Sequence, residues 1–176
     1  ERKEISEREN ISLDIIGITN SKKMMLKDGI IDLEAAKSVS DKDESLDQTD
    51  TDEVINHMIN KSASKRIIVD TSASDETPDL YKKIFENGIC IVTANKKGLS
   101  GEIDRYHSIM NSKISNDVDF LYETTAGAAL PFIKSVSDIA SSSDKVRKIE
   151  GIFSGTLAYL FNTFDASIPF SALVNE

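Results

Sequence analysis

In the stretch Glu123-Thr124-Thr125-Ala126-Gly127-Ala128-Ala129-Leu130-Pro131, an acidic residue leads into small residues that end in an apolar residue and a proline. Small residues let the backbone fold tightly and turn several carbonyl oxygens toward one point beside the Glu123 carboxylate. Carbonyl oxygens with one carboxylate suit an alkali or alkaline-earth cation. The simpler interpretation is a tight strand-to-helix turn without an ion, and residue chemistry alone favours it. A second informative stretch follows at Glu150-Gly151-Ile152-Phe153-Ser154-Gly155-Thr156-Leu157.

Composition is that of an ordinary globular protein. The 176 residues are enough for one domain or slightly more, with 39% hydrophobic and 29% charged residues. The net charge of −9 argues against nucleic-acid binding, because phosphate contacts need a basic surface. We find no signal peptide and no apolar run of about 18 residues, so no membrane association is expected. The single cysteine, Cys90, lies in an apolar run and is predicted to be a core residue of a cytoplasmic protein, with a plastid as the alternative for a plant gene.

Strand and helix patterns alternate along the chain. Strands are predicted over residues 13–19, 66–70, 89–93, 119–124 and 146–153, and helices over 52–60, 77–87, 102–113, 130–140 and 155–164. Strands joined by helical crossovers of this length predict an α/β fold with a doubly wound parallel sheet.

Polar residues follow three of these strands, at 20–23, 70–74 and 93–97. In open parallel sheets, ligands bind outside the carboxyl ends of the strands. Polar residues at a single strand end are common, but three such ends in succession favour a site for phosphate, ribose or amide groups.

Six segments carry a resemblance to a known family. They are Gly17-Ile18-Thr19-Asn20-Ser21, Val69-Asp70-Thr71-Ser72, Glu86-Asn87-Gly88-Ile89, Val92-Thr93-Ala94-Asn95-Lys96-Lys97, Leu121 to Pro131, and Lys148 to Tyr159. Together they resemble homoserine dehydrogenase, most closely the form found in fungi and in fused aspartokinase–homoserine dehydrogenases. The resemblance covers nearly the whole chain, with the segments in the family's order.

The resemblance implies a Rossmann-like dinucleotide-binding domain over residues 1–131, followed at 132–176 by the beginning of a mixed α/β domain for substrate binding and dimerisation. It implies reversible NAD(P)H-dependent reduction of aspartate 4-semialdehyde to homoserine, on the route to threonine and methionine. A homodimer and a fused aspartokinase domain are the implied partners. The family's Gly-x-Gly-x-x-Gly turn and its later acidic ligands and lysine do not occur here. We therefore expect a fragment truncated at both ends and inactive by itself.

By the same resemblance, Lys96 is the expected catalytic residue and also contacts the cofactor. A carbonyl that accepts hydride develops alkoxide character, which a nearby ammonium group stabilises. Lys97 is expected to point elsewhere. Thr71 and Ser72 match the position at which the family contacts the nicotinamide half of the cofactor, whereas Ala73 stands where the family has a serine.

NADP is the expected cofactor, with NAD as the alternative. Rossmann-type enzymes that prefer NAD usually carry an acid at the end of the second strand of the fold. By the resemblance, that strand is the one predicted at residues 13–19. Here Asn20, Ser21, Lys22 and Lys23 follow that strand, and the lysines suit a 2′-phosphate. The alternative is that both lysines are merely solvated.

The resemblance also assigns an ion and a substrate segment. It places sodium on Glu123 and on the backbone carbonyls of Ala126, Ala128 and Leu130, with Ala129 standing where the family commonly has glycine. Ser154, Gly155 and Thr156 begin a helix whose N–H groups and hydroxyls suit a small polar substrate, although a plain helix cap is an equal interpretation. His57 and His107 lack the spacing of zinc ligands.

Two other functions stay open from the residues. An aspartate-semialdehyde dehydrogenase would need a nucleophilic cysteine on a polar loop, and Cys90 lies within a predicted strand instead. A non-catalytic regulatory domain with the same fold would have no need of Lys96 or Glu123.

Overall fold

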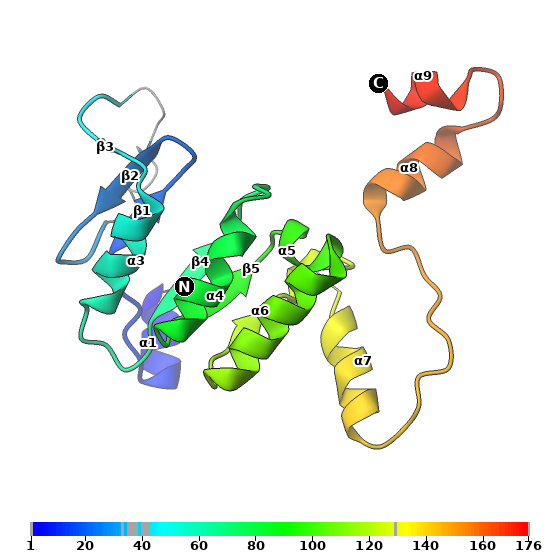
Figure 1. The fold of residues 1–176 in the computed structure, drawn as a ribbon. Coiled ribbons are helices and arrows are strands. Elements are labelled where there is room, and N and C mark those ends of the chain that lie inside the picture. The colour runs from blue at the N-terminus through cyan, green and yellow to red at the C-terminus, as the bar shows by residue number, and fades with distance from the viewer. Residues whose placement is uncertain (1, 33, 35–38, 40–42, 129, 176) are drawn as a thin grey trace. The chain divides into compact units, whose positions relative to one another are not determined.

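We describe the chain from a computed structural model that covers residues 2–32, 34, 39, 43–128 and 130–175. Its internal contacts divide the chain into two compact units, residues 1–66 and 67–176 (Figure 1).

A parallel sheet forms the centre of the second unit. Its strands are β4 (Ile67–Asp70), β5 (Cys90–Thr93) and β6 (Phe120–Leu121), in the order β4-β5-β6. The register places Asp70 beside Thr93, the last residues of their strands. The loops that follow β4 and β5 therefore start side by side at one edge of the sheet.

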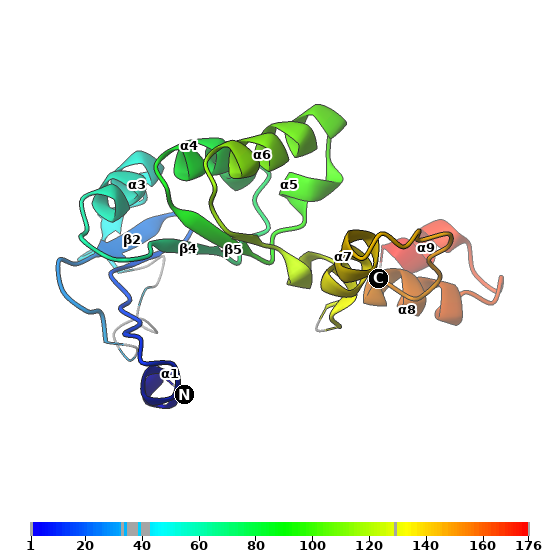
Figure 2. The same cartoon turned by 90° about the horizontal axis from the view of Figure 1, so that it is seen from below.

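Helices connect these strands and cover one face of the sheet. They are η1 (Thr77–Leu80), α4 (Tyr81–Glu86), α5 (Lys97–Ser100) and α6 (Ile103–Ser115). A further short helix, η2 (Glu123–Thr125), follows β6. Figure 2 shows α4 and α6 over the same face of β4 and β5. Phe85, Ile91 and Phe120 are buried in this layer, whereas Ile67 and Val69 of β4 are exposed.

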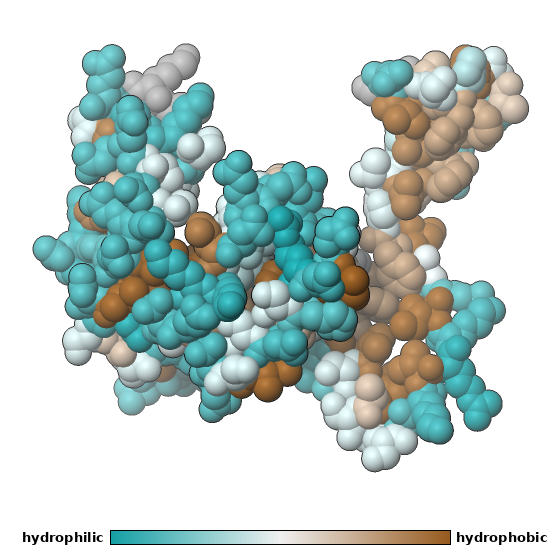
Figure 3. Space-filling model, in the orientation of Figure 1, coloured by the Kyte–Doolittle hydropathy of each residue, from teal (hydrophilic) through white to brown (hydrophobic). Residues whose placement is uncertain are grey.

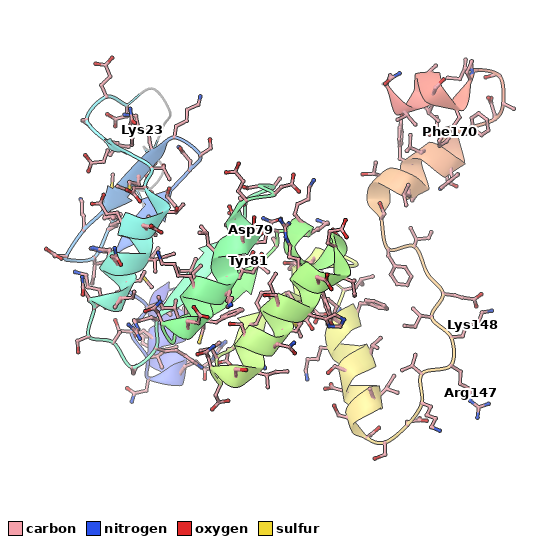
Figure 4. All side chains as sticks on the ribbon, in the orientation of Figure 1. Lys23, Asp79, Tyr81, Arg147, Lys148 and Phe170 are labelled. Carbon is pink, nitrogen blue, oxygen red and sulfur yellow. The ribbon has the colours of Figure 1, made fainter. Side chains whose placement is uncertain are left out.

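Three further helices follow the sheet: α7 (Phe132–Ser141), α8 (Gly155–Thr163) and α9 (Phe170–Val174). The Phe170 ring packs against Phe161 and Phe164, with ring centroids 5.9 and 5.3 Å apart (Figure 4). Large apolar side chains of α8, Leu157 among them, remain exposed. Figure 3 shows the resulting apolar surface over α8 and α9.

The first unit contains an antiparallel sheet of β1 (Gly17–Thr19), β2 (Lys23–Leu26) and β3 (Asp47–Gln48), in the order β1-β2-β3. The unit also contains the helices α1 (Arg2–Glu9) and α3 (Thr51–Ile59). Asp50 caps the start of α3: its carboxylate accepts hydrogen bonds from the N–H groups of Asp52 and Glu53. Met24 of β2 and Ile55 of α3 are buried in this unit.

The predicted helices are confirmed, with residues 77–87 forming η1 and α4 in succession. Burial of Cys90 is confirmed as well. One of the three predicted polar strand ends was wrong. Residues 20–23 do not follow a strand of the parallel sheet, because they form the turn of an antiparallel β1–β2 hairpin. The sequence of β2, Lys-Met-Met-Leu, lacks β-branched residues and therefore gave little strand signal.

A strand over residues 146–153 was also wrong, because this segment has no regular structure. Val146, Ile149 and Ile152 are exposed. Alternating apolar residues form a strand only where a neighbouring strand and a covering layer receive them.

Candidate functional site

The loops after β4 and β5 form the candidate site. Thr71 and Ser72 follow β4, and Lys96 follows β5 at the same sheet edge; all three are exposed. A hydrogen bond of 3.2 Å from the Asn95 amide to Ser72 Oγ joins the two loops. The structure therefore brings together the predicted nicotinamide contacts and the predicted catalytic lysine, on exposed polar loops that fit a nicotinamide dinucleotide.

A buried polar group supports these loops from below. Asp70, at the end of β4, is 5% exposed, and its Oδ1 accepts the N–H of Ser72 at 2.8 Å. Its Oδ2 accepts the hydroxyl of Tyr81 at 2.5 Å. Tyr81 comes from the first turn of α4 (Figure 4). Burial and this hydrogen bond hold the pKa of the Tyr81 hydroxyl well above its usual value, so that it stays a donor.

The sequence placed Asp70 and Asn95 within two of the polar strand ends but gave neither of them a role, and it did not place Tyr81 in the site. The available signal was an acid at the end of an apolar strand, since a buried carboxylate needs donors nearby. Tyr81 gave no separate signal, because its position in the helical pattern is that of a core residue.

The two neighbouring lysines differ in their surroundings. Lys97 Nζ lies 3.3 Å from Asp75 Oδ2, in an exposed ion pair. The backbone N–H of Lys97 donates to Asn95 Oδ1 at 3.0 Å and so fixes the start of α5. Lys96 is exposed directly before it. Of these two adjacent lysines, Lys97 is thus paired with a surface carboxylate, whereas Lys96 lies on the loop of the candidate site.

The predicted phosphate-binding residues lie on the β1–β2 hairpin of the first unit. Asn20 Oδ1 accepts the N–H groups of Lys22 and Lys23, both at 2.8 Å, and so builds the turn. Lys23 Nζ donates to the carbonyl of Leu46 at 2.8 Å (Figure 4). Ser21 and Lys22 are exposed. Of the two predicted lysines, Lys23 is therefore engaged in holding the hairpin to the segment before β3.

Glu123 caps a helix. Its carboxylate oxygens accept the N–H groups of Ile133 and Lys134, at 2.8 and 2.9 Å, in the first turn of α7. Such a carboxylate is stabilised by the free N–H groups and the positive end of the helix dipole.

The turn between Glu123 and α7 has the tight geometry that the small residues predicted. Gly127 and Ala128 are both left-handed, with φ of 70° and 53°. The Leu130 carbonyl accepts the N–H of Phe132 at 2.8 Å and keeps a second lone pair. The glycine substitution noted at Ala129 lies outside the described residues. Backbone carbonyl oxygens are a donor type that suits a hard cation, while the Glu123 carboxylate already accepts two N–H groups.

Ser154 is the N-cap of α8, and its Oγ accepts the N–H of Leu157 at 3.2 Å. Gly155 and Thr156 are exposed in the first helical turn. An open, mainly apolar hollow of about 370 Å³ adjoins them. It is lined by Gly151, Ile152, Phe153, Ser154, Leu157, Ala158, Phe161 and Asn162.

Within the described residues, no three His, Cys, Asp or Glu side chains gather as metal ligands. His57 Nε2 instead lies 3.0 Å from the carbonyl oxygen of Lys27. No helix in the described part of the chain is long and apolar enough to span a bilayer.

Two family models match the chain. The model described as "Homoserine dehydrogenase, NAD binding domain" matches residues 3–123, and "Homoserine dehydrogenase" matches residues 131–176. Among curated relatives, the chloroplastic bifunctional aspartokinase/homoserine dehydrogenase 2 of Zea mays is 35% identical over 173 residues. That match covers 98% of this chain but 19% of the relative, so the chain spans about a fifth of its length.

Solved structures support the same fold. Homoserine dehydrogenase from Thermoplasma acidophilum matches with a TM-score of 0.69 and 24% identity, over 98% of this chain and 53% of that one. A hyperthermophilic archaeal homoserine dehydrogenase in complex with NADPH matches with a TM-score of 0.56 and 25% identity. It covers 77% of this chain and 43% of the archaeal one. The predicted α/β, Rossmann-like fold class is thereby confirmed.

Proposed function

The chain belongs to the homoserine dehydrogenase family, and from this premise we propose that the full-length protein reversibly reduces aspartate 4-semialdehyde to homoserine with NAD(P)H. The observation that carries the proposal is the exposed Lys96 on the β5 loop, fixed beside the Ser72 loop at the carboxyl edge of a parallel sheet. This reaction serves threonine and methionine synthesis.

Lys96 is the proposed catalytic residue. When bound, the nicotinamide supplies the hydride, and the Lys96 ammonium group stabilises negative charge that develops on the carbonyl oxygen of the substrate. Thr71 and Ser72, on the adjoining loop, contact the nicotinamide half of the cofactor. The Ser154-Gly155-Thr156 turn of α8 binds polar groups of the substrate through its N–H groups and hydroxyls.

Replacement of Lys96 by alanine in the full-length protein tests this role. We expect kcat to fall by about 10²-fold or more, with the Kd for the cofactor nearly unchanged, because the main loss is the partner of the transition-state charge and the cofactor keeps its other contacts. Lys97→Ala is the matched control, since it removes the adjacent lysine, which pairs with Asp75. Steady-state consumption of NADPH with aspartate 4-semialdehyde measures both. Normal turnover in the Lys96 variant would refute the assignment.

NADP is the proposed cofactor, bound at its 2′-phosphate by Lys22, with Asn20 and Ser21 on the same hairpin turn. The support is the exposure of Ser21 and Lys22 on a turn that carries no acid. Lys22→Ala should raise KM for NADPH by about 10-fold, the effect of one charged hydrogen bond, and leave KM for NADH unchanged. Lys27→Ala, at an exposed lysine just beyond β2, is the control. An equal effect on both cofactors would contradict the assignment.

We also propose a sodium ion at the turn before α7, held by Glu123 and by the carbonyls of Ala126, Ala128 and Leu130. The left-handed backbone at Ala128 supports it. Because the Glu123 carboxylate caps α7, we assign its main-chain oxygen to the ion. Exchange of sodium chloride for choline chloride at equal ionic strength should then lower the melting temperature. An unchanged melting temperature would argue for a plain turn.

A homodimer formed through the domain that begins at residue 132 belongs to the same proposal, as does an upstream aspartokinase domain. The second is supported by relatives named as bifunctional aspartokinase/homoserine dehydrogenases. The cytoplasm is the proposed location, and the chloroplastic names of the plant relatives support a plastid for a plant gene. The domain boundary at residue 131 stays a prediction.

A further inference from the structure

The side chain of Asn95 forms hydrogen bonds to both loops of the candidate site, the one after β4 and the one after β5. Its side chain is 1% exposed. The amide nitrogen lies 3.2 Å from Asp70 Oδ2, 3.2 Å from Ser72 Oγ and 2.9 Å from the carbonyl oxygen of Ser74. Two amide hydrogens thus serve three acceptors, all on the β4 strand end and its loop.

The other end of the same side chain holds the β5 loop. Asn95 Oδ1 accepts the backbone N–H of Lys97. The backbone N–H of Asn95 also donates to Thr93 Oγ1, at 2.9 Å. Lys96 lies between these two fixed residues. The direction of its backbone is consequently set by a side chain whose remaining contacts are all on the neighbouring loop.

Tyr81 gives this connection a rigid support. Its hydroxyl donates to Asp70 Oδ2 and lies 2.9 Å from Thr93 Oγ1, so that it touches the last residues of both β4 and β5. Its ring is buried and packs edge-on against Phe120, with ring centroids 5.7 Å apart. Because packing fixes the ring, the hydroxyl has little freedom to follow movements of the loops.

We propose that Asn95, held in place by Asp70 and Tyr81, is a positioning residue that sets Lys96 against the Ser72 loop for hydride transfer. The inference rests on the proposed function and deepens it. A group needed for folding alone would only have to satisfy buried donors and acceptors. Here the partners of Asn95 lie on the two segments that carry the proposed nicotinamide contacts and the proposed catalytic lysine. A displacement of about 1 Å at such a group costs up to about 10²-fold in rate.

Two variants of the full-length protein test the proposal. Tyr81→Phe removes one hydroxyl, keeps the ring, and touches neither loop; we expect kcat to fall about 10-fold while KM for NADPH changes less than about 2-fold. Asn95→Ala should lower kcat by about 10²-fold. Tyr106→Phe, the same chemical change on α6 outside this group, is the control and should behave as wild type. Thermal unfolding identifies any variant that is not folded at the assay temperature, and Tyr81→Phe decides if Asn95→Ala does not fold.

A double-mutant cycle separates positioning from a merely structural role. If Tyr81 acts through Lys96, Tyr81→Phe has no further effect on kcat in the Lys96→Ala background. Additive losses, or a lowered melting temperature with normal kcat, would overturn the proposal. A severe Lys96→Ala defect with normal Tyr81→Phe and Asn95→Ala kinetics would remove this inference and leave the proposed function standing. A normal Lys96→Ala enzyme would remove the proposed function, and the inference with it.

Discussion

Two serine-containing turns of the chain, at Ser72 and at Ser154, are built in opposite ways. Ser72 is tied by its N–H to buried Asp70 and by its hydroxyl to Asn95, residues from two different strand ends. The Ser154 hydroxyl accepts the N–H of Leu157 and the Ser154 carbonyl accepts the N–H of Ala158, both from the first residues of its own helix. The first turn is held by side chains from the ends of β4 and β5, whereas the hydrogen bonds of Ser154 described above lie within α8. The difference teaches that these two candidate binding turns should respond differently to mutation.

Removal of Asp70 should give the largest effect. Asp70→Ala removes the buried carboxylate that accepts hydrogen bonds from the Tyr81 hydroxyl, the Asn95 amide and the Ser72 N–H, at a cost of about 3 kcal/mol in local stability. Hydrogen exchange of β4 and β5 amides measures this loss, and α8 amides should not change. Asp104→Ala, at an exposed acid in α6, is the control. Equal loss of protection in α8 would show that the two turns are not independent.

Addition of a methyl group at two glycines should give the next effect. A Cβ at Gly98 would lie 2.9 Å from Cβ of Pro78, whereas one at Gly155 meets nothing within 4 Å. We expect Gly98→Ala to destabilise the β5–α5 region by about 1–3 kcal/mol through overpacking. Gly155→Ala should be neutral or stabilise α8 slightly, since alanine is the better helix former. Chemical denaturation of both variants checks the contrast, and equal midpoints would break it.

Loss of the helix cap should give the smallest effect. Ser154→Ala removes a single exposed hydrogen bond and should cost α8 about 0.5–1 kcal/mol. Ser154→Asp keeps a capping oxygen and should restore the stability. Exchange rates of the first α8 amides provide the measurement. A loss that reaches β4 would mean that Ser154 has partners in the sheet.

The same contrast explains what the sequence could predict. A serine before Gly-Thr-Leu indicates a helix start from neighbouring residues alone, and α8 begins where this pattern places it. The side-chain donors to Asp70, on Tyr81 and Asn95, lie 11 and 25 residues away, so only the folded sheet identifies them. The parallel strands at 66–70 and 89–93 were predictable because their apolar runs are continuous.

At Glu123, the sequence indicated the place of a carboxylate but not its hydrogen-bond partners. The sequence pointed to a carboxylate beside a tight turn, and the structure places it there. Its partners, however, are N–H groups ten and eleven residues later in α7. Local sequence cannot show where a following helix will direct its first turn.

Cys90 has a consequence for the chemical durability of the protein. The thiol is free and 7% exposed at the start of β5, directly in the sheet that carries Asp70 and Asn95. Oxidants and disulfides react with an accessible thiolate, so they modify this cysteine only while β5 is open. Resistance of Cys90 to oxidation therefore follows the local stability of the sheet. Oxidation of Cys90 would therefore accumulate first in molecules in which the hydrogen bonds among Asp70, Tyr81 and Asn95 are already broken.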